Sequence, residues 1–329
     1  MKKYYDCKNF KRTYLIESFF DYFSVIQEIA SIEKDKLLWY RGQSDEAWHI
    51  KPNLFRCSKE VSDYIGRRVD PLNPKLHFSN GYEVEFPDFV AQLNEFKKLV
   101  KKEFKDKTIL PRNNFDWLFL GQHYGLLTPL VDFSTDPLVA LYFSIEAKFK
   151  NEKQGLDECV KEFDKYGYSS DCAAVFVMLP EEVKRISGYE EKIENRSFNN
   201  IMPITSEEYS TGEFDSYVIW KKVPWTPLCI IAQKKDYRLI RQSGNFLCYG
   251  KNIQSIDYLE CYKNSLYKIY IPHCLFDELN NMLTILDLTH KTIFGENLYD
   301  EVAKKCKNSS LLDFNRKMIE LSKKIKQVK

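Results

Sequence analysis

Three short polar segments of this chain contain the residue types best suited to binding or catalysis. Residues 41–43 read Arg-Gly-Gln and close the apolar segment 36–40; arginine offers a planar fork of donors that suits phosphate or carboxylate. Residues 122–124 read Gln-His-Tyr, and residues 132–136 read Asp-Phe-Ser-Thr-Asp. We expect all three segments at junctions between helices and strands, where loops on a rigid scaffold commonly carry function.

The segment 129–143 predicts a short strand followed directly by a capped helix. Asp136 is a favoured N-cap residue, and Pro137 suits the first helical position. A helix N-terminus presents unpaired N–H groups and a positive partial charge, so this turn suits an anion, with the hydroxyls of Ser134 and Thr135 beside it. Plain capping explains the same residues equally well, and the turn alone leaves both interpretations open.

Each remaining candidate also has a structural explanation. Arg41 suits a ligand phosphate, but it would equally pair with a buried carboxylate such as Asp132. His123 suits a general base or a nucleotide contact, whereas a histidine at a helix end more often complements the helix dipole. The carboxamide of Gln242 could hold a ribose, although a polar neighbour of the turn residue Gly244 is the simpler interpretation.

Several common enzyme classes lose support because their motifs are missing from the sequence. We find no Ser/His/Asp order, no HExxH, no P-loop and no GxGxxG. The nine cysteines form no CxxC pair and show no metal-ligand spacing, so we expect reduced thiols and no metal site. These observations argue against the familiar serine hydrolases, zinc proteases, P-loop NTPases and Rossmann dehydrogenases.

The composition predicts a well-packed globular protein without an obvious nucleic-acid or membrane surface. Of the 329 residues, 44% are hydrophobic and 15% aromatic, and 49 basic residues nearly balance 47 acidic ones. The lysine-rich segments 97–102 and 323–329 are best explained as solvated. No apolar run approaches the roughly 20 residues that cross a bilayer, and no secretory segment begins the chain. We therefore expect a cytoplasmic protein that does not associate with membranes.

The periodicity predicts an α+β fold, with helices mostly in the first half and strands mostly in the second. Amphipathic helices are expected at about 15–30, 88–104 and 313–325. Residues 48–56 look extended, and the charged segment 148–171 looks like an exposed excursion. Strands are expected at 36–40, 129–133, 173–179, 227–232, 246–249 and 266–271.

Several of these segments, taken in order, resemble the FRG domain family, which is named for a Phe-Arg-Gly near its start. The matching segments are 40–43 (Tyr-Arg-Gly-Gln), 51–56 (Lys-Pro-Asn-Leu-Phe-Arg), 122–126 (Gln-His-Tyr-Gly-Leu), 128–143 and 242–246 (Gln-Ser-Gly-Asn-Phe). Tyr40 replaces the family's Phe, and Pro129 stands where the family usually has Arg. The resemblance runs from about residue 33 to 295. It implies a single FRG-like domain across 1–329, with helices at about 15–30 and 313–325 flanking its core.

The Arg-Gly that ends an early strand, and the Phe-Ser-Thr before a helix, are also similar to the first two motifs of ADP-ribosyltransferases. That likeness implies a central mixed or antiparallel sheet split in two halves, with flanking helices. It also implies an enzyme that cleaves the nicotinamide–ribose bond of NAD and transfers ADP-ribose to a macromolecule or to water. A toxin or phage-defence role is what the family associations imply.

The same likeness assigns roles to the candidate residues. Arg41 would hold the NAD phosphates and ribose, and Ser134 would support the nicotinamide–ribose pocket. Gln242 stands roughly where a glutamate would stabilise the ribosyl cation, and an amide cannot supply a full charge. Either another carboxylate does this, with Asp132 the nearest candidate, or the protein binds NAD without turnover. The expected nucleotide-binding residues are Tyr40, Gly42, Gln43, Gln122, His123, Tyr124, Phe133 and Thr135.

Three functions are therefore compatible with the sequence. The first is an ADP-ribosyltransferase-like enzyme with NAD as substrate and a protein, a nucleic acid or water as acceptor. The second is a non-catalytic nucleotide-binding sensor or interaction module that uses the same pocket. The third is a nucleic-acid-associated protein that binds through its lysine-rich helices, which the near-neutral charge disfavours.

Overall fold

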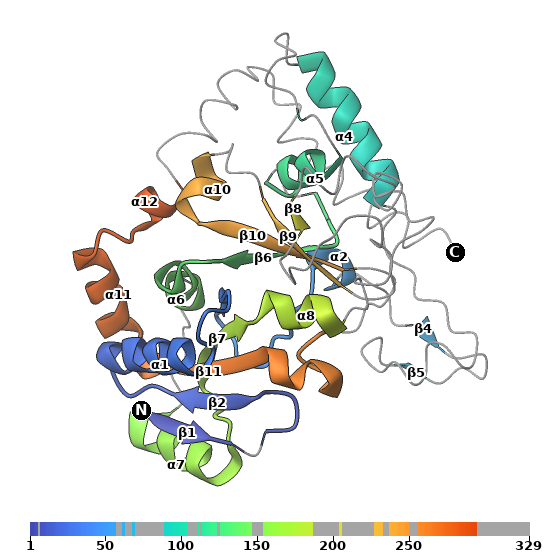
Figure 1. Cartoon of the computed structure of the whole chain (residues 1–329). Helices are drawn as coiled ribbons and strands as arrows, with labels where there is room; N and C mark the ends of the chain where they lie inside the picture. Colours follow the sequence, from blue (N-terminus) through green and yellow to red (C-terminus); the bar gives the residue numbers. More distant parts are fainter. Residues whose placement is uncertain are drawn as a thin grey trace.

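The computed structural model shows a mixed β-sheet with helices on both faces (Figure 1). It describes residues 1–5, 7–56, 61–62, 68–69, 89–103, 111, 114–123, 126–146, 154–186, 204–205, 227–232, 237–249 and 255–294, and every structural statement below concerns these residues.

Nine strands form the main sheet in the order β1-β2-β11-β7-β3-β6-β10-β9-β8. Neighbouring strands are antiparallel except for the β2–β11 and β8–β9 pairs, which are parallel. The bounds are β1 (Lys2–Tyr4), β2 (Arg12–Leu15), β3 (Trp39–Gln43), β6 (Leu130–Ser134), β7 (Cys172–Met178), β8 (Ile204–Thr205), β9 (Leu228–Ile231), β10 (Gly244–Cys248) and β11 (Leu266–Pro272). Two further short strands, β4 (Val61–Ser62) and β5 (Arg68–Val69), pair only with each other.

The junction between β3 and β6 is the narrowest point of the main sheet. The two strands share a single register pair, Tyr40 with Ser134. By contrast, β3 pairs with β7 at five positions, and β6 pairs with β10 at five. The sheet is therefore continuous, but its two groups of strands meet through one main-chain pair. The α+β class and the mixed sheet are confirmed.

Helices cover the sheet on each side. Their bounds are α1 (Phe19–Ile32), α2 (Asn53–Arg56), α4 (Phe89–Glu103), α5 (Asn114–His123), α6 (Pro137–Ile145), α7 (Leu156–Tyr166), α8 (Pro180–Ile186), α10 (Tyr237–Arg241), α11 (Phe276–Ile285) and α12 (His290–Phe294). Two 3₁₀ turns, η4 (Glu260–Ser265) and η5 (His273–Leu275), flank β11.

Strand β7 explains how the two faces are filled. All seven of its residues are buried, and successive side chains point to opposite faces of a sheet. Its residues 174, 176 and 178 join the core that contains side chains of α4 and α5. Its residues 173, 175 and 177 join the core that contains side chains of α1, α6 and α11. The prediction of a buried strand at 173–179 is confirmed.

Three predictions about secondary structure need correction. The helix expected at 15–30 begins at Phe19, after the N-cap Ser18, because residues 12–15 instead pair with β11 as strand β2. The extended segment 48–56 ends in the one-turn helix α2. The excursion expected at 148–171 contains helix α7, whose Cys159 and Phe163 are buried. The helix expected at 313–325 lies outside the described residues.

Candidate functional site

Arg41 is the central cation of the site. Its Nη1 donates to the main-chain oxygen of Asp132 at 2.7 Å, while its Nε is buried without a hydrogen-bond partner among the described residues. Burial lowers the pKa of Arg41; the charge of Asp132 opposes this shift, and the charge of Arg56 reinforces it. Buried polar groups are normally hydrogen-bonded, so a partly unpartnered guanidinium is an exception that needs an explanation.

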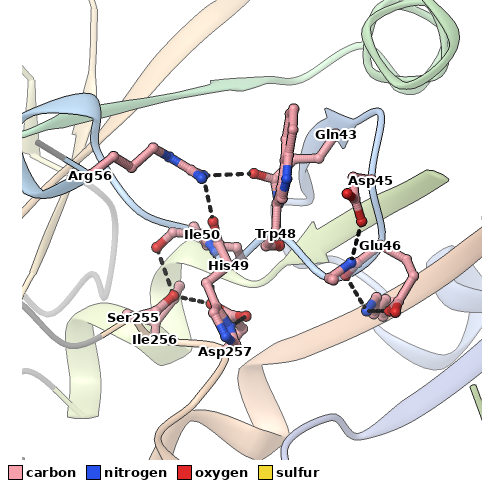
Figure 2. A network of polar contacts seen from close by, with 12 residues as sticks. Gln43, Asp45, Glu46, Trp48, His49, Ile50, Arg56, Ser255, Ile256 and Asp257 are labelled. Carbon is pink, nitrogen blue, oxygen red and sulfur yellow. Dashed lines mark hydrogen bonds and ion pairs between the residues drawn. The ribbon is translucent and has the colours of Figure 1, made fainter. Parts of the chain in front are cut away.

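A second arginine, Arg56, lies beside the end of β3. Its Nη2 donates to Gln43 Oε1 at 3.3 Å and to the His49 carbonyl at 2.8 Å (Figure 2). Its Nε donates to the Lys51 carbonyl at 3.2 Å. Gln43 completes the link, because its Nε2 donates to the Trp48 carbonyl at 2.9 Å. Helix α2 and the 48–51 segment are thus tied to β3 by side-chain contacts.

Asp257 also fixes the 48–51 segment, through contacts with His49 and Ile50. Its carboxylate accepts from the main-chain N–H of Ile50 at 2.9 Å, lies 2.8 Å from His49 Nδ1 and contacts the Ser255 hydroxyl (Figure 2). Burial would raise the pKa of Asp257, but the contact with His49 and the hydrogen bonds from Ser255 and Ile50 outweigh it, so the pKa lies below its ordinary value. The Tyr249 hydroxyl also donates to the Ile50 carbonyl. The backbone that presents Arg56 and Trp48 is therefore rigidly held.

Neither arginine has an ion pair within the described part of the chain. Arg41 contacts the main-chain oxygen of Asp132, and the carboxylate of Asp132 accepts instead from Gln122 Nε2 at 2.7 Å. The hydrogen bonds of Arg56 all go to neutral oxygens. Burial also lowers the pKa of Arg56, although Asp257 and Tyr249 oppose the shift. Two partly desolvated guanidiniums without a bonded carboxylate form an arrangement that suits an anionic ligand.

Gln122 and Asp132, both predicted as site residues, do lie together next to Arg41. The Gln122 amide bridges Asp132 and the Thr128 hydroxyl, which donates to its oxygen. The amide thereby fixes the direction of the Asp132 carboxylate. The side chain of His123 and the whole of Tyr124 lie outside the described residues.

Tyr40 and Phe133 are core residues and do not join the arginines. Tyr40 belongs to the core on the opposite face of the sheet from Trp39, as the alternation along β3 requires. Burial, with a contribution from the charge of Asp136, raises the pKa of Tyr40 to about 12. The ring of Phe133 packs against Trp39 with ring centres 6.3 Å apart. The expectation that both rings contact a nucleotide is not supported by these positions.

Gly42 is needed for helix packing. A Cβ atom at Gly42 would lie 1.9 Å from the Ala140 carbonyl oxygen and 2.6 Å from the Ser144 nitrogen, both in α6. The missing side chain lets α6 approach β3 directly. The space beside Gly42 is therefore filled by α6, in contrast to the expectation of a nucleotide contact.

Ser134 connects the turn before α6 to the start of β10. Its hydroxyl donates to the Gln242 carbonyl at 2.7 Å and accepts from the Asp136 N–H at 2.9 Å. The Asp136 side chain accepts from Leu138 N at 2.8 Å, which confirms the predicted N-cap. Thr135 is exposed, and its main-chain N–H donates to the Ser243 carbonyl. The hydroxyl expected to support a nicotinamide–ribose pocket thus already has a structural role.

Gln242 lies at this turn, and its side-chain amide nitrogen, which is buried, has no hydrogen bond within the described residues. Its main-chain carbonyl accepts from the Ser134 hydroxyl, and within the residues that the structure describes Gln242 makes no hydrogen bond with Arg41. The structure therefore groups the predicted residues in two places: Arg41, Gln43, Gln122 and Asp132 around β3, and Ser134, Thr135 and Gln242 at the start of α6.

Arg56, Trp48, His49 and Asp257 are the site residues that sequence reasoning missed. Arg56 closes the segment 51–56, which carries part of the family resemblance, so a second arginine near Arg41 had a signal in the sequence. Asp257 had no such signal in the sequence, because only the folded structure brings it close to His49 and Ile50. Among the described residues no group of three or more His, Cys, Asp or Glu side chains could hold a metal ion, and no helix is long and apolar enough to cross a bilayer.

Comparison with protein families gives one match, to the FRG domain, over residues 36–153. Neither the curated proteins nor the solved structures yield a match. The matched range contains both arginines, Gln43, Gln122 and Asp132, whereas Gln242 and Asp257 lie beyond it. This is narrower than the range 33–295 expected from the sequence. Residues 36–153 of this chain are thus similar to the FRG domain, and this matched range carries both cations of the site.

Proposed function

We propose that this protein binds the phosphates of NAD at Arg41 and Arg56 and acts as an ADP-ribosyltransferase-like enzyme. The observation that carries the proposal is the pair of partly buried guanidiniums, which have no carboxylate bonded to them within the described residues. Arginine binds phosphate oxygens through two parallel hydrogen bonds, and a desolvated site strengthens them. The likeness to ADP-ribosyltransferases implies a sheet split in two halves, and the narrow β3–β6 junction is compatible with such a split.

In the proposed reaction the C1′–N bond of the nicotinamide ribose breaks, and nicotinamide leaves with the electron pair. A nearby carboxylate stabilises the resulting ribosyl cation. Asp132 is the candidate, because it lies next to Arg41 and Gln122 fixes the direction of its carboxylate. Water or a macromolecular hydroxyl then adds at C1′ and releases its proton to solvent. Loss of NAD from a cell would suit a toxin or phage-defence effector.

A second candidate function is NAD or nucleotide binding without turnover. It is favoured by Gln242, whose neutral amide stands where the likeness to transferases expects a glutamate, and by Ser134, whose hydroxyl is occupied by main-chain groups. A binding module would be stabilised by ligand without consuming it. The expected gain is about 2.7 kcal/mol at a hundredfold excess of ligand over its Kd.

The test is nicotinamide release from NAD by the purified full-length chain and by its Arg41→Ala variant. We expect Arg41→Ala to lower the rate by about 100-fold or more, since loss of one charge-stabilising donor commonly has this effect. Arg185→Ala is the matched control: it also removes one guanidinium, but from an exposed ion pair with Glu182 on α8. Both variants should keep the melting temperature of the wild type within a few degrees.

Two outcomes would separate the two functions. Thermal stabilisation by NAD that Arg41→Ala removes, without any nicotinamide release, would contradict the enzyme and support the binding module. If NAD and ADP-ribose neither stabilise the wild type nor are consumed by it, both functions are wrong.

A further inference from the structure

Trp48 is an exposed aromatic side chain next to Arg56. It is 46% exposed, and the guanidinium carbon of Arg56 lies 5.8 Å from its ring centre. Tryptophan carries the largest apolar surface of any side chain, so leaving half of it in water forgoes a substantial hydrophobic gain. The half-exposed indole, beside a guanidinium that has no ion pair among the described residues, therefore has a surface available for a ligand.

The backbone on both sides of Trp48 is fixed. The Trp48 N–H donates to the Asp45 carbonyl at 3.2 Å, and the Trp48 carbonyl accepts from Gln43 Nε2 at 2.9 Å. The next two residues, His49 and Ile50, are both bonded to the carboxylate of Asp257. An aromatic ring on a rigid backbone loses little conformational freedom when a ligand stacks on it.

We propose that the Trp48 indole is the stacking surface for the aromatic base of the nucleotide whose phosphate is bound by Arg56 and Arg41. The inference rests on the proposed nucleotide binding and adds the group that recognises the base. A nucleotide carries its base only a few bonds from its phosphate, so one neighbouring guanidinium and indole can hold both parts. The Gln43 amide links the two residues, because its oxygen accepts from Arg56 and its nitrogen donates to the Trp48 main-chain carbonyl (Figure 2).

This arrangement predicts a ligand class and a lack of base selectivity. Stacking uses the π-face that every base possesses, and it is therefore tolerant of base identity. A nucleoside diphosphate should bind more tightly than pyrophosphate, which has no base, and more tightly than adenosine, which has no phosphate. ADP and GDP should bind with similar affinity.

The experiment measures the Kd of pyrophosphate, adenosine, ADP and GDP by calorimetry for the full-length wild type, Trp48→Ala and Trp48→Phe. For ADP we expect Trp48→Ala to raise the Kd between about 5-fold and 150-fold, the range set by stacking on one aromatic ring, and Trp48→Phe to raise it less. The Kd of pyrophosphate should stay within twofold. Tyr168→Ala is the matched control, because Tyr168 is 44% exposed but lies near α7, and it should bind ADP as the wild type does.

A second measurement does not depend on the alanine variant folding. Titration of the wild type with ADP should quench tryptophan fluorescence, and Trp48→Phe should lose that change, while pyrophosphate should leave the signal unaltered. Equal losses of ADP and pyrophosphate affinity in Trp48→Ala, or ADP binding no tighter than pyrophosphate in the wild type, would overturn the stacking role and leave phosphate binding intact. If none of the phosphates binds the wild type, the proposed function fails together with the stacking role.

Discussion

Gly42→Ala is expected to prevent folding or to lower the free energy of unfolding by more than about 3 kcal/mol. Overpacking a core ordinarily costs about 1–3 kcal/mol, when neighbouring side chains can shift. Here the new methyl group would meet main-chain atoms, the Ala140 oxygen at 1.9 Å and the Ser144 nitrogen at 2.6 Å, so helix α6 itself would have to move. Urea unfolding followed by circular dichroism measures the loss.

Gly155→Ala is the matched control for this replacement. A Cβ atom at Gly155 would have no heavy atom within 4 Å, apart from its own chain neighbours. Because Gly155 is the N-cap of α7, we expect a loss below about 1 kcal/mol. Equal stability of the Gly42 and Gly155 variants would contradict the close contact between β3 and α6.

Asp257→Ala is expected to lower the free energy of unfolding by about 3–5 kcal/mol, because several hydrogen bonds to a buried carboxylate are lost together and each contributes about 1.5–3 kcal/mol. The carboxylate is only 5% exposed and holds His49, the Ile50 N–H and Ser255 together. Its loss frees the 48–56 segment, so affinity for pyrophosphate should fall as well.

The control for Asp257 is an aspartate on the surface. Asp164 pairs with Lys2 at 3.1 Å, and the Asp164 side chain is 53% exposed. Exposed ion pairs contribute about 0–1 kcal/mol, so Asp164→Ala should change the urea midpoint little. An Asp257→Ala variant as stable as Asp164→Ala would show that the carboxylate does not hold the segment.

The contribution of Asp257 should also depend on pH. Its pKa in the folded protein lies below the ordinary value of 3.8, so folding favours the ionised carboxylate. The stabilisation is then fully present above about pH 4 and is lost as the pH falls through the folded-state pKa. Urea titrations from pH 7 to pH 2.5 should show the wild type and Asp257→Asn converging at the acid end. A stability difference that grows as the pH falls would contradict the lowered pKa.

Local patterns predicted those elements whose residues are determined by their near neighbours. The strand expected at 173–179 is β7, because a continuous apolar run suits burial on both faces. Asp136 caps α6 as its type and the following proline indicate. The alternation of side chains along a strand is equally local, and it assigns Tyr40 and Arg41 to opposite faces of the sheet.

The missed features depend on contacts between distant residues. Leu15 and Ile16 fit an amphipathic helix, yet residues 12–15 pair with β11, more than 250 positions later in the chain. Helix α2 has one turn, which is too short to show a helical period. The carboxylate of Asp257 lies about 200 positions from His49 in sequence, and only the fold brings the two together. The contribution of Asp257 to the candidate site was therefore not accessible to sequence patterns.

The single register pair between β3 and β6 gives Arg41 a mechanical role. Main-chain pairing binds each group of strands internally, but across this boundary the Arg41 guanidinium, donating to the Asp132 carbonyl, supplies a cross-link made by a side chain. A phosphate that competes for the same guanidinium acts directly on that cross-link. Occupancy of the site and the relative displacement of the two strand groups are then thermodynamically linked, so each influences the other by the same free energy.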